Sequence, residues 1–343
     1  MEDQKEFITV IITSYNRKKY LLDAIRSVLS CSLEKKYFEI ILVKNYNDDE
    51  IDSFCRLNNI KNLQMDGSIG HFYSKAIESS KGNIISFLDD DDMWTDDKLA
   101  KVYDAFKNNN NLGYYHNKYV YINDVGEKIN YRRVVEKRKD LIRSNSLFIE
   151  GRDKKNALIK LFKSSADFNM SCISIRKSIL DNDYKFLENI YSFQDGAFFF
   201  ISMLSNYDIL IDDRVLTLYR INNDSVTYFN DEAKRVSELK KMEISMVAVK
   251  NYIEEHSNQE DVFLKEAIKC FIYEILIMIE VFSLNTRRRT VLKYLIHLIK
   301  IRKKNVNNLR NKIVAMAIIS IFSKKLSVNI YYKYKKIIIA KKL

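Results

Sequence analysis

Short apolar runs alternate with amphipathic patterns over the first 110 residues of the chain. Residues 7–13 and 83–88 have the apolar character of fully buried strands. Between them, Leu21, Ile25 and Val28 follow a spacing that places them on one face of a helix. Alternation of this kind is typical of βαβ units. We therefore predict an α/β fold with a mostly parallel sheet flanked by helices.

The rest of the chain is assigned from the same two periodicities. Further strands are expected at residues 37–45, 62–65, 115–122, 170–175 and 208–218. Further helices are expected at residues 69–80, at residues 95–106 and from about residue 195. Residues 123 to about 152 read as a polar loop. The α/β domain should extend over residues 1–230, and residues 231–343 should form a helical C-terminal region.

Charge is divided unevenly along the chain. No acidic residue follows Glu280, whereas residues 281–343 contain seventeen Lys and Arg. The preceding 280 residues hold the other 40 basic groups and all 45 acidic ones, so the body is mildly acidic and the tail strongly basic. A basic tail favours an anionic partner, which is either nucleic acid or a membrane surface.

Apolar residues within this tail favour the membrane. Blocks such as residues 313–322 lie between the basic residues, as in helices that bind at a lipid interface. Because no nucleic-acid motif is present, we expect an anionic membrane surface as partner and no nucleic acid. The alternative is that these helices pack on the body or on a second subunit, which leaves a homo-oligomer open.

The chain has no predicted membrane span. No apolar stretch reaches the roughly 18 residues of a spanning helix, and residues 1–6 are charged and lack a signal peptide. We expect a cytoplasmic protein that is peripheral at the inner face of the cell membrane. The cysteines form no zinc-ligand pattern and should be reduced, buried thiols. They are Cys31, Cys55, Cys172 and Cys270.

Four consecutive aspartates, residues 89–92, follow the expected strand 83–88. Adjacent carboxylates repel one another unless a cation compensates them. In open α/β sheets, ligands bind at the carboxyl ends of the strands. One or two of these carboxylates would suit Mn²⁺ or Mg²⁺ bridging to a substrate diphosphate. We favour this site over a solvated acidic loop or a helix N-cap.

Two segments of the chain resemble the family 2 glycosyltransferases. Residues 10–17, Val-Ile-Ile-Thr-Ser-Tyr-Asn-Arg, are similar to the family's "V-I-I-P-T-Y-N-R". Residues 87–94, Phe-Leu-Asp-Asp-Asp-Asp-Met-Trp, are similar to "F-L-D-x-D-D-x-W", which contains the family's D-x-D motif. Residues 70–76 also resemble "G-x-x-x-A-R-N". The similarity extends over about residues 7–225 and excludes the basic tail.

The resemblance implies a GT-A fold, which is a Rossmann-like sheet flanked by helices. Residues 1–112 would be the nucleotide-sugar-binding half and residues 113–230 the acceptor-binding half. By this resemblance, Asp91 is the principal metal ligand and Asp89 contacts the metal or the ribose, whereas Asp92 is a weaker candidate ligand. The other residues assigned to the nucleotide sugar are Thr13, Ser14, Tyr15, Arg17, Asn45, Lys75 and Asp90.

Three of these positions depart from the family pattern. Thr13 replaces the proline, and Lys75 replaces an arginine and offers the diphosphate a single point charge. Asn45 stands where the family has the first aspartate of "D-D-G-S", which contacts the base. Its amide offers similar hydrogen bonds, and Asp48 is the alternative.

The resemblance also implies a transfer that inverts the anomeric centre, and such a transfer needs a base that takes the proton of the acceptor hydroxyl. Asp195, within residues 193–198, resembles the family's "E-D" segment at the start of a helix and is the predicted base. Residues 219–225 resemble "Y-R-x-H-x-x-S", with Asn222 in place of the histidine. Residues 198–200, three phenylalanines, should lie in the core, and Trp94 either lies there or flanks the donor.

These features together predict a metal-dependent, inverting, hexosyltransferase-like enzyme. Its donor would be a UDP-, GDP- or dTDP-linked sugar, and its acceptor a glycan or polyprenyl-linked precursor of the cell surface. The alternative is a non-catalytic basic scaffold or nucleic-acid-binding protein with a degenerate sugar-nucleotide domain. No motif specifies the donor sugar or the acceptor.

Overall fold

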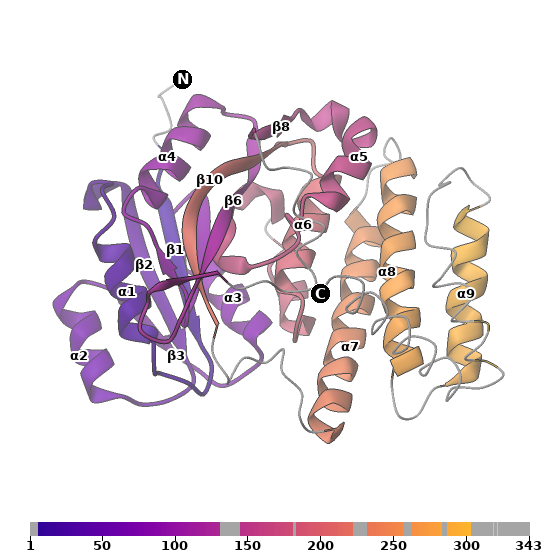
Figure 1. Cartoon of the computed structure of the whole chain (residues 1–343), viewed down its shortest axis with the longest axis horizontal. Helices are drawn as coiled ribbons and strands as arrows, with labels where there is room; N and C mark the ends of the chain where they lie inside the picture. The colour runs from indigo at the N-terminus through magenta and orange to yellow at the C-terminus, as the bar shows by residue number, and fades with distance from the viewer. Residues whose placement is uncertain are drawn as a thin grey trace. The chain divides into compact units, whose positions relative to one another are not determined.

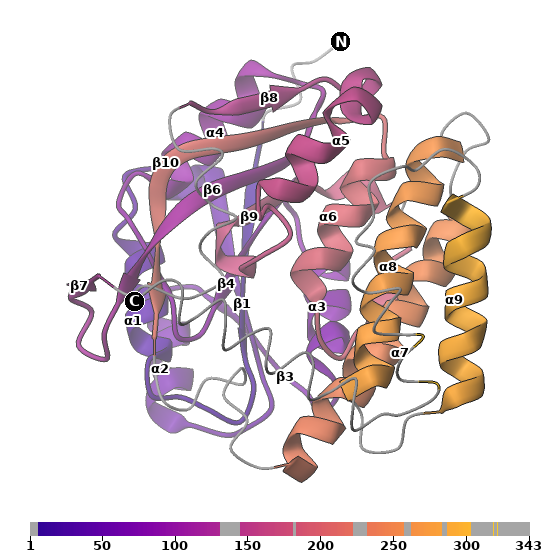
Figure 2. The same ribbon diagram turned by 45° about the vertical axis from the view of Figure 1, so that its right-hand side comes forward.

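The computed structural model describes residues 6–130, 145–180, 183–221, 232–256, 262–282 and 287–302, with the single positions 318 and 321. Contacts divide the chain into two compact units, Met1–Tyr228 and Phe229–Leu343. The first unit contains the sheet and its flanking helices, and the second is helical (Figures 1 and 2).

Four parallel strands form the N-terminal half of the sheet, in the order β3-β2-β1-β4. Their bounds are β1 (Ile8–Ser14), β2 (Phe38–Lys44), β3 (Lys61–Gln64) and β4 (Ile84–Asp89). The connecting helices are α1 (Leu21–Leu29), α2 (Asp49–Leu57) and α3 (Ile69–Glu78). Every residue of β1 is buried, as expected for a strand covered on both faces.

The other strands continue this sheet beyond β4, in the order β4-β9-β6-β10-β5. The strand β9 (Ile173–Arg176) is antiparallel to both neighbours, whereas β6 (Leu112–Ile122) and β10 (Asp208–Arg220) are parallel to each other. Three short strands are β5 (Met93–Trp94), β7 (Lys128–Ile129) and β8 (Leu147–Ile149). The helices of this half are α4 (Lys98–Asn108), α5 (Lys154–Lys163) and α6 (Gln194–Leu204).

Alternate residues of the central strands point to opposite faces of the sheet. Ile8, Val10 and Ile12 belong to a core that also contains the predicted stripe of α1 and buried residues of α2 and α4. On the other face, the ring of Phe87 packs against Tyr73 of α3 and Phe198 of α6. Figure 1 accordingly shows α1 and α2 on one side of the sheet and α3 on the other. The predicted α/β class is confirmed.

Five helices and strands of the first unit were not predicted, namely α2, α5, β5, β7 and β8. Helix α2 buries only Ile51 and Cys55, a stripe too narrow to stand out as a periodic pattern. Helix α5 was also missed, and β5 and β8 are only two and three residues long. The predicted loop 123–152 was therefore wrong where it includes β7 and β8. Residues 170–172 form a 3₁₀ turn before β9, and α4 begins at Lys98, three residues later than expected.

The second unit contains α7 (Glu232–His256), α8 (Val262–Phe282) and α9 (Arg288–Arg302). Successive helices pack on each other, α7 on α8 and α8 on α9. The guanidinium of Arg287, just before α9, forms ion pairs with Glu280 near the end of α8 and with Glu243 of α7. The predicted C-terminal helical region is confirmed for these residues, and most of residues 303–343 lie outside the described part. Within that part, no helix is long and apolar enough to cross a membrane.

Candidate active site

The aspartate run begins at the carboxyl end of β4. In the parallel register, Asp89 lies beside Thr13 of β1, and Ser14 lies beside Lys44 of β2. Residues 14–17, 45–48 and 89–92 therefore leave the sheet at the same edge. This is the edge at which open α/β sheets bind ligands. Strand register thus brings both predicted motifs together, although they are more than 70 residues apart in sequence.

Arg17 is bound to two of the aspartates. Its Nε donates to Asp90 Oδ1 at 2.8 Å, and its Nη1 lies 2.9 Å from Asp91 Oδ2. Burial opposes the charge of Arg17, but Asp90 and then Asp91 raise its pKa overall. The arginine that we predicted in the nucleotide pocket therefore already neutralises part of the acidic cluster. It is still one-third exposed, so part of its side chain remains accessible to a ligand.

One arginine does not balance the negative charge of the cluster. Burial, together with Asp91 and Asp90, raises the pKa of Asp89 to about 8. Burial also raises the pKa of Asp90 to about 6 although Arg17 opposes this shift, and it raises that of Asp92 well above the usual range. At neutral pH and without a cation, Asp89 therefore tends to hold a proton.

The donor set of this cluster suits a hard divalent cation. Carboxylate oxygens are preferred by Mg²⁺ and Mn²⁺, and the buried Oδ2 atoms of Asp90 and Asp92 lack a hydrogen-bond partner among the described residues. No group of three or more His, Cys, Asp or Glu side chains in the described ranges is arranged to hold a metal ion. Any ion held here by the described side chains would therefore have at most two of them as ligands, and phosphate and water would complete its coordination.

Arg220 holds the main chain of the aspartate loop. Its backbone N–H donates to Asp92 Oδ1 at 3.0 Å, and its Nε donates to the carbonyl oxygen of Asp91 at 2.9 Å. Its Nη1 donates to the carbonyls of Asn123 and Asp124 at 2.9 and 2.7 Å. The side chain is fully buried. Sequence reasoning noted Arg220 only as part of a motif and assigned it no role.

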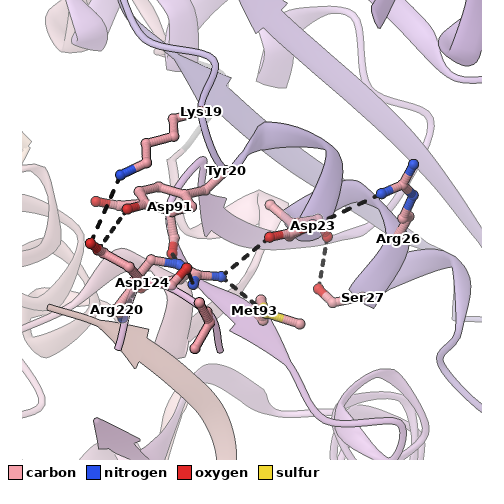
Figure 3. Close-up of polar contacts among 12 residues, drawn as sticks. Lys19, Tyr20, Asp23, Arg26, Ser27, Asp91, Met93, Asp124 and Arg220 are labelled. Carbon is pink, nitrogen blue, oxygen red and sulfur yellow. Dashed lines mark hydrogen bonds and ion pairs between the residues drawn. The ribbon is translucent and has the colours of Figure 1, made fainter. Parts of the chain in front are cut away.

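The same guanidinium also contacts the start of α1. It stacks over the ring of Tyr20 with 4.3 Å to the centroid, and its Nη2 lies 3.6 Å from Asp23 Oδ2. Figure 3 shows Arg220 between Asp23 and Met93 on one side and Asp91 and Asp124 on the other. Arg220 therefore links the end of β10, the aspartate loop, the turn after β6 and α1. Two other residues of this motif, Asn222 and Ser225, lie outside the described part of the chain.

The nucleotide-side residues of β1 are held by two tyrosines. Tyr73 OH lies 3.3 Å from Thr13 Oγ1, and Tyr46 OH lies 2.7 Å from Ser14 Oγ. Tyr46 OH also donates to the carbonyl of Arg17 at 3.0 Å. Tyr15, which directly follows Ser14, is 48% exposed. Sequence reasoning missed Tyr46, although its place in the segment that departs from "D-D-G-S" was a usable signal.

Asn45 lies at the predicted edge but is paired with Asn16. Asn45 Oδ1 accepts from the Asn16 backbone N–H at 2.9 Å, and Asn45 Nδ2 donates to Asn16 Oδ1 at 2.8 Å. Asn16 has φ of 54°, a left-handed conformation that asparagine tolerates. The alternative, Asp48, caps α2 by accepting from the Ile51 backbone N–H at 3.1 Å. Asp48 therefore has a structural role.

Lys75 lies on α3 and forms ion pairs with carboxylates other than the cluster. Its Nζ is 2.9 Å from Glu78 Oε2 and 4.0 Å from Glu188 Oε1. In the described part of the chain, no ion pair joins Lys75 to residues 89–92. Helix α3 itself is placed by Gly70, where a Cβ atom would lie 2.0 Å from the carbonyl oxygen of Leu187. The glycine of the motif therefore serves close packing.

Asp195 lies in the first turn of α6, as predicted. Its Oδ1 accepts from the Gly196 backbone N–H at 2.9 Å, and its Oδ2 accepts from that of Asn169 at 3.0 Å. Burial raises the pKa of Asp195 to about 6 against these hydrogen bonds, with Asp167 adding to the rise. The charge of Asp195 in turn raises the pKa of Asp89. The predicted base and the aspartate cluster are therefore electrostatic neighbours.

Trp94 belongs to the core and does not flank an open site. It is 2% exposed, and its Nε1 donates to the carbonyl of Ser171 at 2.8 Å. Ser171 Oγ also accepts from the backbone N–H of Asp89 at 3.0 Å. Ser171 thus supports the aspartate loop, and nothing in its local sequence indicated this. The three phenylalanines at 198–200 are buried, as predicted.

Residues 9–183 match the model of the family described as Glycosyl transferase family 2. The chain belongs to this family. It is 31% identical over 132 residues to an uncharacterized glycosyltransferase of Rickettsia conorii and 32% identical over 108 residues to the minor teichoic acid biosynthesis protein GgaA of Bacillus subtilis. These matches cover 36% and 29% of the chain, and 20% and 24% of the two relatives. The chain thus spans about a quarter or less of their length.

Crystal structures of TarS from S. aureus share the fold of this family member. The match to the longer structure covers 94% of this chain and 53% of the TarS chain, with a TM-score of 0.56 and 16% identity. The structure of TarS 1–349 in complex with UDP-GlcNAc covers 90% of each chain, with a TM-score of 0.51 and 15% identity. The likeness confirms the predicted GT-A fold.

Proposed function

We propose that the first unit transfers a sugar from a nucleoside-diphosphate carrier to an acceptor hydroxyl, with inversion at the anomeric carbon. The observation that carries this proposal is that two kinds of carboxyl group occur near each other, one suited to binding a cation and the other suited to accepting a proton. An undercompensated aspartate cluster lies at the ligand-binding edge of the sheet, and a carboxylate with a pKa of about 6 lies near it. The UDP-GlcNAc complex of TarS supports a nucleotide-sugar donor.

Asp91 and Asp89 would hold Mn²⁺ or Mg²⁺. When bound, such an ion supplies positive charge to the departing nucleoside diphosphate. The protein prepares this site by fixing the loop: Arg17 orients the Asp91 carboxylate, and Arg220 holds its carbonyl. Because these contacts are already formed, few side chains must reorganise when the donor binds.

Asp195 would accept the proton of the acceptor hydroxyl. As the hydroxyl oxygen bonds to the anomeric carbon, the bond from that carbon to the diphosphate oxygen breaks on the opposite side, and the proton passes to Asp195. A base is most effective when its pKa lies near the working pH. Partial burial raises the pKa of Asp195 toward that range, and two backbone N–H groups hold its orientation.

The nucleotide would lie beside β1 and β2. Tyr15 exposes nearly half of its surface at this edge, and Asn45 keeps one N–H and one lone pair beyond its pairing with Asn16. These groups offer a stacking face and hydrogen bonds to a base, and Arg17 offers its exposed part to the phosphates. Lys75 would reach the diphosphate only by leaving Glu78 and Glu188.

We further propose a glycan or polyprenyl-linked acceptor from cell-surface glycan synthesis. The relative GgaA, a teichoic acid biosynthesis protein, supports this class of acceptor. A polyprenyl-linked acceptor would require the protein at the inner face of the cell membrane.

The experiment that tests this function is a screen of UDP-, GDP- and dTDP-linked sugars for hydrolysis and binding, with and without Mn²⁺. Wild type is compared with Asp91→Asn, Asp195→Asn and the control Asp104→Asn, whose residue is exposed on α4. We expect one donor class to be turned over with Mn²⁺ by wild type and control, and much more slowly by both site variants. Failure of every donor to bind or react, with no effect of Mn²⁺, would overturn the proposal.

A further inference from the structure

Helix α9 carries two separate apolar faces. Val291, Leu295 and Leu298 are buried, and α9 packs on α8. A second set, Leu292, Ile296 and Ile299, is between 40% and 46% exposed. The spacing i, i+4, i+7 places this second set in one stripe along the helix. Because the first set already secures α9 to its neighbour, the exposed stripe is not needed for that packing.

Basic residues flank the exposed stripe on one side. Arg289, Lys293 and Lys300 are exposed and follow one row of the helix next to the apolar residues. No acidic residue occurs in α9 or anywhere after Glu280. Burial and the nearby Lys300 and Lys293 also lower the pKa of His297. The stripe therefore borders a strip of positive charge that its own helix does not neutralise.

We propose that this α9 surface, formed by Leu292, Ile296 and Ile299 with Arg289, Lys293 and Lys300, binds an anionic phospholipid surface. Helices that lie at a lipid interface combine an apolar stripe with flanking Lys and Arg in this way. The apolar side chains enter the headgroup boundary while the cations meet lipid phosphates. This inference goes beyond the sugar transfer proposed above and does not depend on it.

Charge distinguishes lipid from the other candidate occupants. Residues 303–343 contain no acidic residue, so this segment cannot neutralise the strip. Two copies of the α9 surface facing each other would place like charges together, which is unfavourable. Nucleic acid would satisfy the cations but would leave the apolar stripe without an apolar environment. An anionic bilayer satisfies both halves of the surface.

The test is vesicle co-sedimentation of the full chain. The vesicles contain either phosphatidylglycerol with phosphatidylcholine or phosphatidylcholine alone. We expect binding to the anionic vesicles that weakens as salt is added. The triple variants Leu292→Gln/Ile296→Gln/Ile299→Gln and Arg289→Gln/Lys293→Gln/Lys300→Gln should each bind about tenfold less tightly or worse. The control Leu57→Gln changes an exposed leucine of α2 and should bind as wild type does.

Two outcomes would overturn the proposal. One is unchanged vesicle binding by both triple variants, with thermal unfolding showing that they are folded. The other is a change of oligomeric state in analytical ultracentrifugation on substituting the stripe, without loss of vesicle binding, which would assign the surface to a second copy. Both readouts are independent of activity, so they stand whether or not a donor sugar is found.

Discussion

At the residue scale, the chemistry of the site follows from an imbalance of charge. Arg17 forms ion pairs with Asp90 and Asp91, and burial, together with Asp91 and Asp90, still raises the pKa of Asp89 to about 8. A carboxyl in this state destabilises the protein when it is ionised and is relieved by a proton or a cation. Active sites commonly give up stability for such arrangements.

Replacing Asp89 should therefore stabilise the cation-free protein. Its folded-state pKa of about 8 lies above the usual value of 3.8, so its ionisation costs stability as pH rises between these two values. We expect Asp89→Asn to raise the free energy of unfolding by on the order of 2 kcal/mol at pH 7, with a smaller difference at pH 5. Thermal unfolding across this pH range measures it.

The same unfolding experiment includes Mn²⁺. The ion should raise the midpoint of wild type and of the control Asp104→Asn and should have little effect on Asp89→Asn. If Asp89→Asn is less stable than wild type at every pH, or if Mn²⁺ raises its midpoint as much as that of wild type, the proposed destabilisation by the Asp89 charge is wrong.

Asp195 predicts a pH dependence of the transfer reaction. The base form is the carboxylate, so the rate should rise as pH increases through about 6 and remain high above it. Asp195→Asn should lower kcat by about 10²–10⁴-fold while donor binding changes little. Donor affinity measured by calorimetry provides the control. A loss of donor binding equal to the loss of rate would argue against a role as base.

A positive charge at position 220 should not be enough to hold the aspartate loop, because the hydrogen bonds of the guanidinium are also needed. Lysine keeps the charge but cannot bond the carbonyls of Asp91, Asn123 and Asp124 together. We expect Arg220→Lys to lower the free energy of unfolding by about 2–4 kcal/mol and to weaken Mn²⁺ binding. Arg152→Lys, at an exposed arginine, is the matched control. If Arg220→Lys unfolds as wild type does and binds Mn²⁺ with the same affinity, Arg220 does not position the aspartate loop.

At the scale of elements, parallel strands position the site and close helix packing supports it. The parallel strands β1 and β4 end side by side, and this register alone brings the loops that follow them together. Helix α3 brings Tyr73 under Thr13 only because Gly70 allows close approach to the carbonyls of Leu187 and Ile190. The glycine of this motif therefore acts on the site through the placement of a whole helix.

Gly70→Ala should displace α3 from residues 185–190. The added Cβ would lie 2.0 and 2.3 Å from two carbonyl oxygens, which is too close for a backbone contact. We expect a loss of about 1–3 kcal/mol in the free energy of unfolding, measured by denaturant titration. Donor affinity should fall as well, since Tyr73 moves with the helix. Unchanged stability in this variant would show that the neighbouring segment yields freely.

At the scale of the whole molecule, the candidate active site and the basic surface of α9 belong to different units of the chain. The aspartate cluster and Asp195 belong to the first unit, whereas α9 and its basic strip belong to the second. Buried thiols occur in both units, and all four cysteines are buried and outside any disulfide, as predicted. Burial raises the pKa of Cys31 and of Cys55 to about 11, which keeps both in the unreactive thiol form.

A thiol titration tests this arrangement across the molecule. Without reductant, Ellman's reagent at pH 8 should react slowly with the native chain and should titrate four thiols in denaturant. A rapidly reacting thiol in the native protein would contradict the burial of the cysteines. Fewer than four thiols in denaturant would instead indicate a disulfide.

The sequence by itself determined the class of the fold, the order of the main strands and the place of the aspartates. These follow from local patterns: the apolar runs that became β1 and β4, the stripe of α1, and carboxylates placed directly after a strand. Only the tertiary structure decided which groups meet. The pairing of Arg17 with Asp90 and Asp91, of Asn45 with Asn16, and of Arg220 with the aspartate loop depends on strand register and packing between distant segments, which local periodicity does not encode.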